Sequence, residues 1–190
     1  MTVILQLVWL GTPIVLSGLL HLLVLTRDLW PALRRAPIDF GATLRGKRVF
    51  GANKTWRGAL VVIGGSATFS TLFAQFNDAT LHWPVPVPYA ELHPTAWGAL
   101  LGLGYILGEL PNSFIKRQLE IAPGAMAHGR RGRVFWVADQ LDSLAGMLLC
   151  VWPVWQPSLA VVVSGAVVLL ILHPLSSWIM VLAGLKDRVG

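Results

Sequence analysis

Five apolar stretches separated by polar segments restrict this chain to a fold that lies largely inside a membrane. The first covers about residues 3–25, and one helical crossing of a bilayer core needs about 20 such residues. The others cover about residues 58–76, 92–110, 141–155 and 159–183, and those at 92–110 and 141–155 are short for a full crossing. We therefore predict an all-α integral membrane protein, a compact bundle of about five transmembrane helices that forms a single domain over residues 1–190.

The overall composition supports a membrane protein and removes several other classes. Hydrophobic residues make up 55% of the 190 positions and charged residues 13%, with a mean hydropathy of +0.64, above the usual values for a soluble domain. Cys150 is the single cysteine, so neither an intramolecular disulfide nor a cysteine-based metal site is available. Because no charged side chain precedes Arg27, we expect the first stretch to be retained as a span.

The basic residues indicate how the bundle is oriented. Eight of the 15 Lys and Arg residues lie at 27–57, five at 116–133, and Lys186 and Arg188 follow the last span, while the loop at 77–94 has none. By the positive-inside rule, we predict an external N-terminus, a cytoplasmic C-terminus and a multi-pass protein of the cell (inner) membrane whose active site faces the cytoplasm. The net charge of +6 then indicates topology and phosphate-bearing partners, and nucleic acid is not expected as a partner.

Glycines inside the apolar stretches indicate closely packed helices. Gly98, Gly102, Gly104 and Gly108 recur at spacings that let neighbouring helix backbones approach each other. Such packing replaces the hydrophobic drive that is missing between helices in lipid.

The polar segment at 45–58 alternates cations with glycines, which let backbone amides approach an anion. Asn53, Lys54 and Arg57 stand at the predicted start of the second span, where a helix N-terminus adds partial positive charge. We predict that these three residues bind phosphate. For Arg34 and Arg35 we prefer the simpler interpretation, contact with lipid head groups.

A second pattern places one acid and two cations around the end of the third span. Glu109 precedes Lys116 and Arg117 by about two helical turns. An ionisable residue at the edge of an apolar segment is costly and usually has a partner. Glu109 could simply pair with Lys116 or Arg117, but we favour a role in a site because the same loop leads to a further acidic pair.

That pair, Asp139 and Asp142, opens the fourth apolar stretch at i and i+3, hence on one face of a helix. Two such carboxylates repel unless a cation joins them, and Mg²⁺ is commonly held by one or two carboxylates plus substrate phosphates. N-terminal capping could explain either aspartate alone. It explains less well their combination with Glu109 and Lys116. We predict cytoplasmic active-site loops at about 27–57 and 111–140.

In this order, the motifs resemble the CDP-archaeol synthase family, relatives of the CDP-diacylglycerol synthases. The resemblance covers about residues 37–143, and the ordered set is far more specific than any single motif. It implies a five-span enzyme that uses Mg²⁺ to transfer a cytidylyl group from CTP to a phosphorylated membrane lipid, giving a CDP-lipid and pyrophosphate in phospholipid biosynthesis. It implies Glu109, Asp139 and Asp142 as metal ligands and catalytic residues together with Lys116, and Asn53, Lys54, Arg57, Ser113 and Arg117 as substrate-binding residues.

The chain departs from the family pattern at two places. The family usually has Asp where this chain has Glu109, whose extra methylene changes the reach toward a metal. The segment at 125–136 also differs, and we assign its His128 no catalytic role. The lipid stays open between phosphatidic acid and its archaeal-type ether analogue, as do a second cation and a homodimer.

Three other interpretations compete with this one. A non-enzymatic adaptor that binds anionic lipid through its basic loops would gain nothing from Asp139 and Asp142. A phosphatidyltransferase that consumes CDP-lipids usually has an Asp-x-x-Asp-Gly-x-x-Ala-Arg stretch, which this chain lacks. A transporter would place ionisable groups nearer the middle of the membrane, where His21 and His173 are the candidates and satisfied packing is the better interpretation.

Overall fold

The computed structural model describes residues 2–125 and 129–182, and it confirms a helical membrane bundle. His128, Lys186 and Arg188 lie outside the described residues. Two short strands, β1 (Thr43–Leu44) and β2 (Lys47–Arg48), pair antiparallel in the loop before the second long helix. The helices are α1 (Thr2–Thr26), α2 (Pro31–Arg34), α3 (Trp56–Phe76), the π-helix η1 (Asn77–Leu81), α4 (Pro94–Gln118), α5 (Gly129–Val151) and α6 (Leu159–Leu182).

Within the described part of the chain, four helical segments combine the length and hydropathy of a membrane span: α1, α3 continued by η1, α5 and α6. The predicted first, second and last spans agree with α1, α3 and α6 to within two residues at each end. The remaining long helix, α4, has 25 residues, enough to cross a bilayer, but its second half carries Glu109, Lys116 and Arg117. The orientation of the bundle across the membrane stays a prediction.

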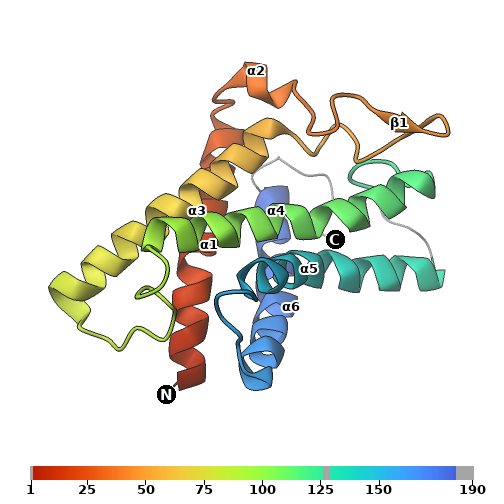
Figure 1. Cartoon of the computed structure of the whole chain (residues 1–190). Coiled ribbons are helices and arrows are strands. Elements are labelled where there is room, and N and C mark those ends of the chain that lie inside the picture. Colours follow the sequence, from red (N-terminus) through yellow and green to blue (C-terminus); the bar gives the residue numbers. More distant parts are fainter. Residues whose placement is uncertain (1, 126–128, 183–190) are drawn as a thin grey trace.

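The long helices cross rather than all running parallel. In Figure 1, α4 and α5 lie side by side and run in opposite directions, while α1 and α6 cross them steeply. Helix α3 runs obliquely and packs on α1 and α4, so that α4 lies between α3 and α5. The loop at 27–55, with α2 and the β1–β2 hairpin, lies over the end of α4.

The two short predicted spans correspond to longer helices, and the one predicted at 141–155 ends earlier, at Val151. Helix α4 continues through Pro111 to Gln118, and α5 begins at Gly129, so much of the expected loop at 111–140 is helical. Asp139 and Asp142 therefore stand in the third and fourth turns of α5. The capping interpretation is wrong, because only the first turn of a helix has unpaired N–H groups to cap.

Glycines fix the distance from α4 to both of its neighbours, as the sequence predicts. A Cβ built on Gly98 would lie 2.2 Å from the carbonyl oxygen of Ser66 in α3. One built on Gly108 would lie 2.1 Å from the carbonyl oxygen of Asp142 in α5. Real Cβ atoms do not approach so closely, so the three backbones touch only because these positions have no side chain.

The core lies at the end of the bundle that carries the loop at 82–93. Trp9 and Trp97 are fully buried there, and Leu101 lies with them. Tyr89 from that loop packs edge-on against Trp9 with ring centroids 5.4 Å apart, and its hydroxyl shares a hydrogen bond with Ser70. The loop at 82–93 is therefore a packed connector between η1 and α4.

Candidate active site

Helix α4 presents polar side chains in two adjacent rows. Glu109, Ser113 and Arg117 follow one another at four-residue spacing and so share a face. Asn112 and Lys116 form the neighbouring row at the same spacing. The first row is turned toward the loop before α3, and the second toward α5.

The first row meets the loop through an ion pair. Lys54 Nζ lies 2.5 Å from Glu109 Oε2, and both side chains are 20% exposed. The alternative interpretation, in which Glu109 simply pairs with Lys116 or Arg117 within α4, is wrong, since Lys54 is its partner. The ion pair brings together two predicted site residues that are 55 positions apart in the sequence.

Arg117 lies under the same loop with unused hydrogen-bonding capacity. Its side chain is 9% exposed, and within the described residues its Nε and Nη1 have no hydrogen-bond partner. A Cβ built on Gly51, whose φ is +97°, would lie 3.3 Å from Arg117 Nη1 and 3.4 Å from Asn53 Oδ1. A guanidinium held without a counter-charge beneath a glycine backbone is suited to bind an anion.

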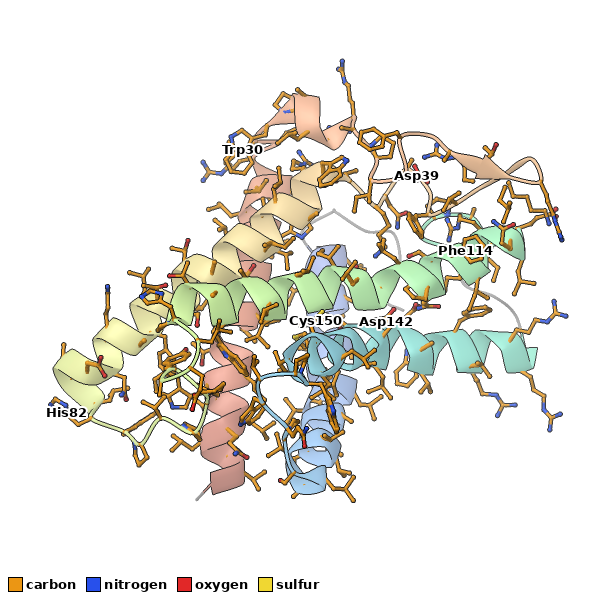
Figure 2. All side chains as sticks on the ribbon, in the orientation of Figure 1. Trp30, Asp39, His82, Phe114, Asp142 and Cys150 are labelled. Carbon is orange, nitrogen blue, oxygen red and sulfur yellow. The ribbon has the colours of Figure 1, made fainter. Side chains whose placement is uncertain are left out.

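The second row connects α4 to α5. Lys116 forms an ion pair with Asp139, whose Oδ2 lies 2.6 Å from the ammonium nitrogen. Asn112 donates two hydrogen bonds from one amide nitrogen, at 2.6 Å to Asp139 Oδ1 and 2.8 Å to Asp142 Oδ2. The two aspartates thus converge on a single point between the helices, and Asp142 is seen there in Figure 2.

The three predicted metal ligands lie in two groups, Asp139 with Asp142 at Asn112 and Glu109 at Lys54. Among the described residues, no three Asp, Glu, His or Cys side chains stand close enough to hold a metal ion. Asp139 and Asp142 nevertheless aim one oxygen each at the positively polarised amide of Asn112. Two carboxylate oxygens that share one donor fit a small, hard cation, whose other ligands would be waters and phosphate oxygens. The third predicted ligand, Glu109, is turned to Lys54.

Arg57, another predicted phosphate ligand, is engaged elsewhere. Its Nη1 donates to Asp28 Oδ1 at 2.8 Å and to the carbonyl of Leu29 at 3.1 Å, and its side chain is buried. These bonds connect the start of α3 to the segment that directly follows α1. Thr55 caps α3 by accepting a hydrogen bond from the backbone N–H of Gly58, which confirms the predicted helix start beside Lys54.

Several residues near the cluster escaped the sequence analysis as site candidates. Asn112 is not among the predicted site residues, although it lies four residues before Lys116 and therefore on the same face of the helix. Tyr105 lies one turn before Glu109 on α4 and interacts electrostatically with it. His21 of α1, interpreted as packing, lies within electrostatic range of Glu109 and Lys54, which only the tertiary fold could reveal.

Asp39 was not singled out either, yet it organises the loop that covers α4. Its carboxylate accepts hydrogen bonds from the backbone N–H groups of Gly41, Phe50 and Gly51 at 2.9–3.2 Å, and from Arg48 at 2.7 Å. The side chain is 1% exposed. Figure 2 shows Asp39 in the loop above α4, where it fixes the backbone that lies over Arg117.

We predict that Asp39→Asn loosens this loop. Burial of the Asp39 carboxyl opposes ionisation, but the four hydrogen bonds outweigh it and lower the pKa from 3.8 to about 2. Because the folded-state pKa is the lower one, the stabilisation, about 2 kcal/mol, is present above pH 3.8 and is lost as the pH falls toward 2. In limited proteolysis near neutral pH, the protease should cut the Asp39→Asn variant within residues 27–55 faster than it cuts the parent. The control variant Asp78→Asn should be cut there at the parent rate. Equal cleavage rates for Asp39→Asn and the parent would contradict the prediction.

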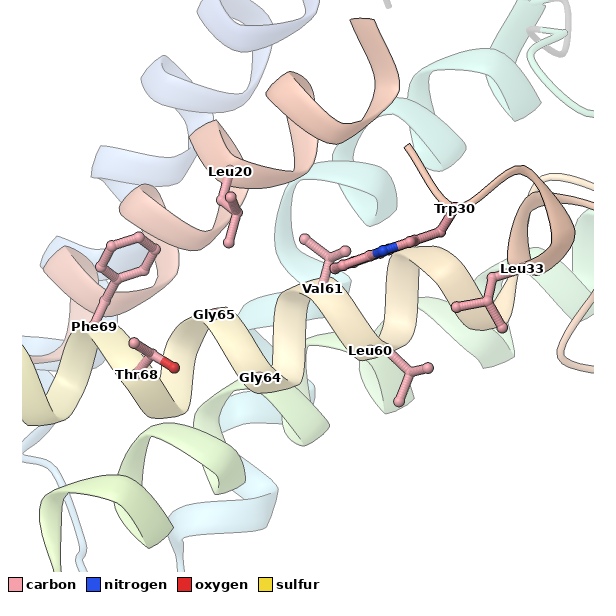
Figure 3. Close-up of a pocket in the computed structure, with 9 residues that line it drawn as sticks. All are labelled: Leu20, Trp30, Leu33, Leu60, Val61, Gly64, Gly65, Thr68 and Phe69. Atoms are coloured by element: carbon pink, nitrogen blue, oxygen red, sulfur yellow. The ribbon is translucent and has the colours of Figure 1, made fainter. Parts of the chain in front are cut away.

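An apolar groove runs along α3 on its α1 side. Its volume is about 470 Å³, and it follows α3 from Leu60 to Phe69 (Figure 3). Trp30 and Leu33 from the segment after α1 cover one end, and Thr68 and Phe69 lie at the other. The full lining is Leu20, Trp30, Leu33, Leu60, Val61, Gly64, Gly65, Thr68 and Phe69.

The fold and the site together define an integral membrane enzyme, with acids and lysines gathered from a loop and two helices. A family model for CarS-like CDP-archaeol synthase matches residues 3–189. The chain belongs to this family, and it is a cytidylyltransferase of lipid biosynthesis. The adaptor and transporter interpretations are therefore wrong.

Relatives from several archaea agree. A CDP-archaeol synthase of Pyrococcus furiosus is 35% identical over 145 residues, which cover 75% of this chain and 74% of that protein. One from Halobacterium salinarum is 34% identical over 160 residues, covering 80% and 82%. A solved intramembrane enzyme for archaeal membrane lipids biosynthesis shares the fold, with a TM-score of 0.61, 24% identity and coverage of 92% and 94%.

Proposed function

We propose that this chain transfers the cytidylyl group of CTP to the phosphate of a membrane lipid and releases pyrophosphate, with Mg²⁺ as cofactor. The observation that carries the proposal is the convergence of Lys54–Glu109, Lys116–Asp139 and the Asn112 bridge in a chain of this family. The names of the relatives favour an ether-linked isoprenoid lipid phosphate as the acceptor.

The reaction needs little acid–base help. An oxygen of the lipid phosphate attacks the α-phosphorus of CTP, a new P–O bond forms, and the bond from the α-phosphorus to the bridging oxygen of the β-phosphate breaks. The lipid phosphate is already largely ionised near neutral pH if its second pKa is about 6, as in phosphorylated side chains. The main obstacle is repulsion between two anions, which positive groups must offset while they align the reactants.

The cationic residues of the site suit that task. Arg117, buried and with two unpaired nitrogens among the described residues, would bind a phosphate under the Gly51 loop together with Asn53. Lys54, from the loop before α3, and Lys116, from α4, would contact phosphates of the two substrates. Ser113, one turn from Glu109 on α4, would contact a phosphate as well. Asp139 and Asp142 would hold Mg²⁺, which when bound supplies positive charge to the reacting phosphate groups.

The groove along α3 would hold part of a lipid chain. It is lined almost entirely by apolar side chains, and its end at Leu60 is about one turn from the start of α3, which follows Lys54 closely in sequence. A chain lying there would have its phosphate directed toward Lys54 and the polar end of the bundle. We place that end at the cytoplasmic face, because the basic segments surround it.

We predict that Gly64→Leu raises the KM for the lipid about tenfold and changes kcat less, because leucine displaces contacts equal to about two methylene groups of the chain. A Cβ on Gly64 meets nothing within 4 Å, so the new side chain enters the groove without a clash. Gly18→Leu on α1, also in open space and outside the groove lining, is the matched control. An unchanged KM in Gly64→Leu would remove the groove from lipid binding.

The proposed function is tested directly with the purified protein in detergent. Labelled CTP and Mg²⁺ are incubated with the ether-linked isoprenoid lipid phosphate or, in parallel, with phosphatidic acid. CDP-lipid and pyrophosphate are then measured in equal amounts. We expect product with at least the ether lipid; absence of product with both lipids in folded protein would overturn the assignment of the acceptor.

A further inference from the structure

The side-chain donors around Asp139 and Asp142 occupy the positions that a cation would need. Asn112 Nδ2 lies 2.6 Å from Asp139 Oδ1 and 2.8 Å from Asp142 Oδ2, between the two carboxylates. Lys116, which lies on α4 like Asn112, donates to both oxygens of Asp139 on α5. Asp142 Oδ1 accepts from the backbone N–H of Ser143 at 2.7 Å, which leaves Oδ2 directed at Asn112.

A divalent cation that enters this point alone must displace two donors. It would take the oxygens from the Asn112 amide and would separate Lys116 from Asp139, leaving an ammonium group of low exposure, 15%, beside the new positive charge. Glu109 is already paired with Lys54 and so is not free to offset that charge. Like charges so close together in a poorly solvated site repel strongly.

The phosphates of a nucleotide remove this obstacle. A phosphate group is an alternative acceptor for the Lys116 ammonium, and a lysine can move to it because its four-carbon stem is flexible. Once Lys116 has a phosphate partner, Asp139 keeps only the neutral amide of Asn112 as competitor. Binding of the cation and of the nucleotide must then favour one another by the same factor.

We propose that Asn112 is a positioning residue that holds Asp139 and Asp142 together in the nucleotide-free enzyme and competes with the divalent cation for their oxygens, so that the cation binds well only together with CTP. This inference rests on the proposed function for the identity of the nucleotide and the cation. The competition itself follows from the observed contacts of Asn112 and Lys116 with Asp139 and Asp142.

The test measures free Mn²⁺ by electron paramagnetic resonance during titration of the detergent-solubilised protein, with and without CTP and with no lipid acceptor. Asn112→Leu, which keeps a similar side-chain volume but cannot donate, should bind Mn²⁺ without CTP about tenfold more tightly than the parent. Lys116→Met should change Mn²⁺ binding in the same direction. In both variants, CTP should tighten Mn²⁺ binding less than it does in the parent.

Lys47→Met is the matched control. It removes one ammonium from the same face, but its partners are Glu120 and the carbonyl of Gln118, outside the cluster. Lys47→Met should bind Mn²⁺ with the affinity of the parent. If Lys47→Met instead bound Mn²⁺ as tightly as Asn112→Leu and Lys116→Met do, the effect would be one of overall charge, and the proposal would be overturned. If Asn112→Leu fails to fold, as judged by circular dichroism, Lys116→Met tests the same competition with Asn112 intact.

Two further outcomes also decide the matter. Weaker or unchanged Mn²⁺ binding in both variants would show that Asn112 and Lys116 do not compete with the cation, and CDP-lipid formation by the parent would still stand. No Mn²⁺ binding by any protein, with or without CTP, would reject the cation site itself and this inference with it. The CDP-lipid assay therefore separates failure of the inference from failure of the proposed function.

Discussion

Replacing Asp139 by asparagine should lower CDP-lipid formation by about a hundredfold or more while the protein keeps its fold. Asparagine has nearly the same shape and can still accept a hydrogen bond from Lys116, so the helices should stay in place. It lacks the negative charge that a divalent cation and the Lys116 ammonium both require. Losses of this size are typical when a charged group that organises a reacting phosphate centre is removed.

The measurement is turnover of labelled CTP under saturating lipid, with folding checked by size-exclusion chromatography and circular dichroism. Asp78→Asn, in the exposed η1 segment, gives the same chemical change away from the site and should retain full activity. If Asp139→Asn keeps a rate within about twofold of the parent, Asp139 has no part in holding a cation.

The second large effect is expected at Gly108, where α4 touches α5. A single added methyl group would lie 2.1 Å from the carbonyl oxygen of Asp142 and 3.0 Å from Gly146 Cα. The helices would have to separate, because backbone atoms cannot turn aside as a flexible side chain can. Asn112 could then no longer bridge the two aspartates, whose bonds of 2.6 and 2.8 Å leave little slack.

Gly108→Ala should therefore reduce activity more than tenfold and lower stability by about 1–3 kcal/mol, the usual cost of overpacking. Thermal unfolding in detergent and CTP turnover measure the two effects on the same sample. Gly18→Ala adds the same methyl group in open space and should change neither quantity. A normal unfolding temperature and normal turnover in Gly108→Ala would mean that α4 and α5 can separate without loss.

The membrane class could be predicted from the sequence alone. So could the bounds of helices α1, α3 and α6, because in each of them the apolar stretch ends close to the end of the helix. The glycine contacts are also predictable, since Gly104 and Gly108 stand four residues apart on one face. The acids and lysines of the candidate site were predicted because their motifs follow a family order, and the structure brings Lys54 to Glu109 and Lys116 to Asp139.

The ends of α4 and α5 could not be predicted from their apolar stretches. Pro111 and the charges after it mark the end of apolar sequence, but the helix continues because contacts with α5 and the loop offset the missing N–H of proline. The partner of Glu109 could not be predicted for the same reason: Lys116 is near it in sequence, yet Lys54 forms the ion pair in the folded chain. Local patterns cannot rank partners that only the tertiary fold brings together.

The polar second half of α4 also has a consequence for how the protein is made. Taken alone, α4 lacks the hydropathy of the other four segments, and its charged groups would be costly in lipid before their partners arrive. Its glycines need the backbone of α3 on one side and that of α5 on the other. In lipid, α4 is therefore expected to be stable only when α5 lies beside it, so the site can be complete only after α5 is also in the membrane.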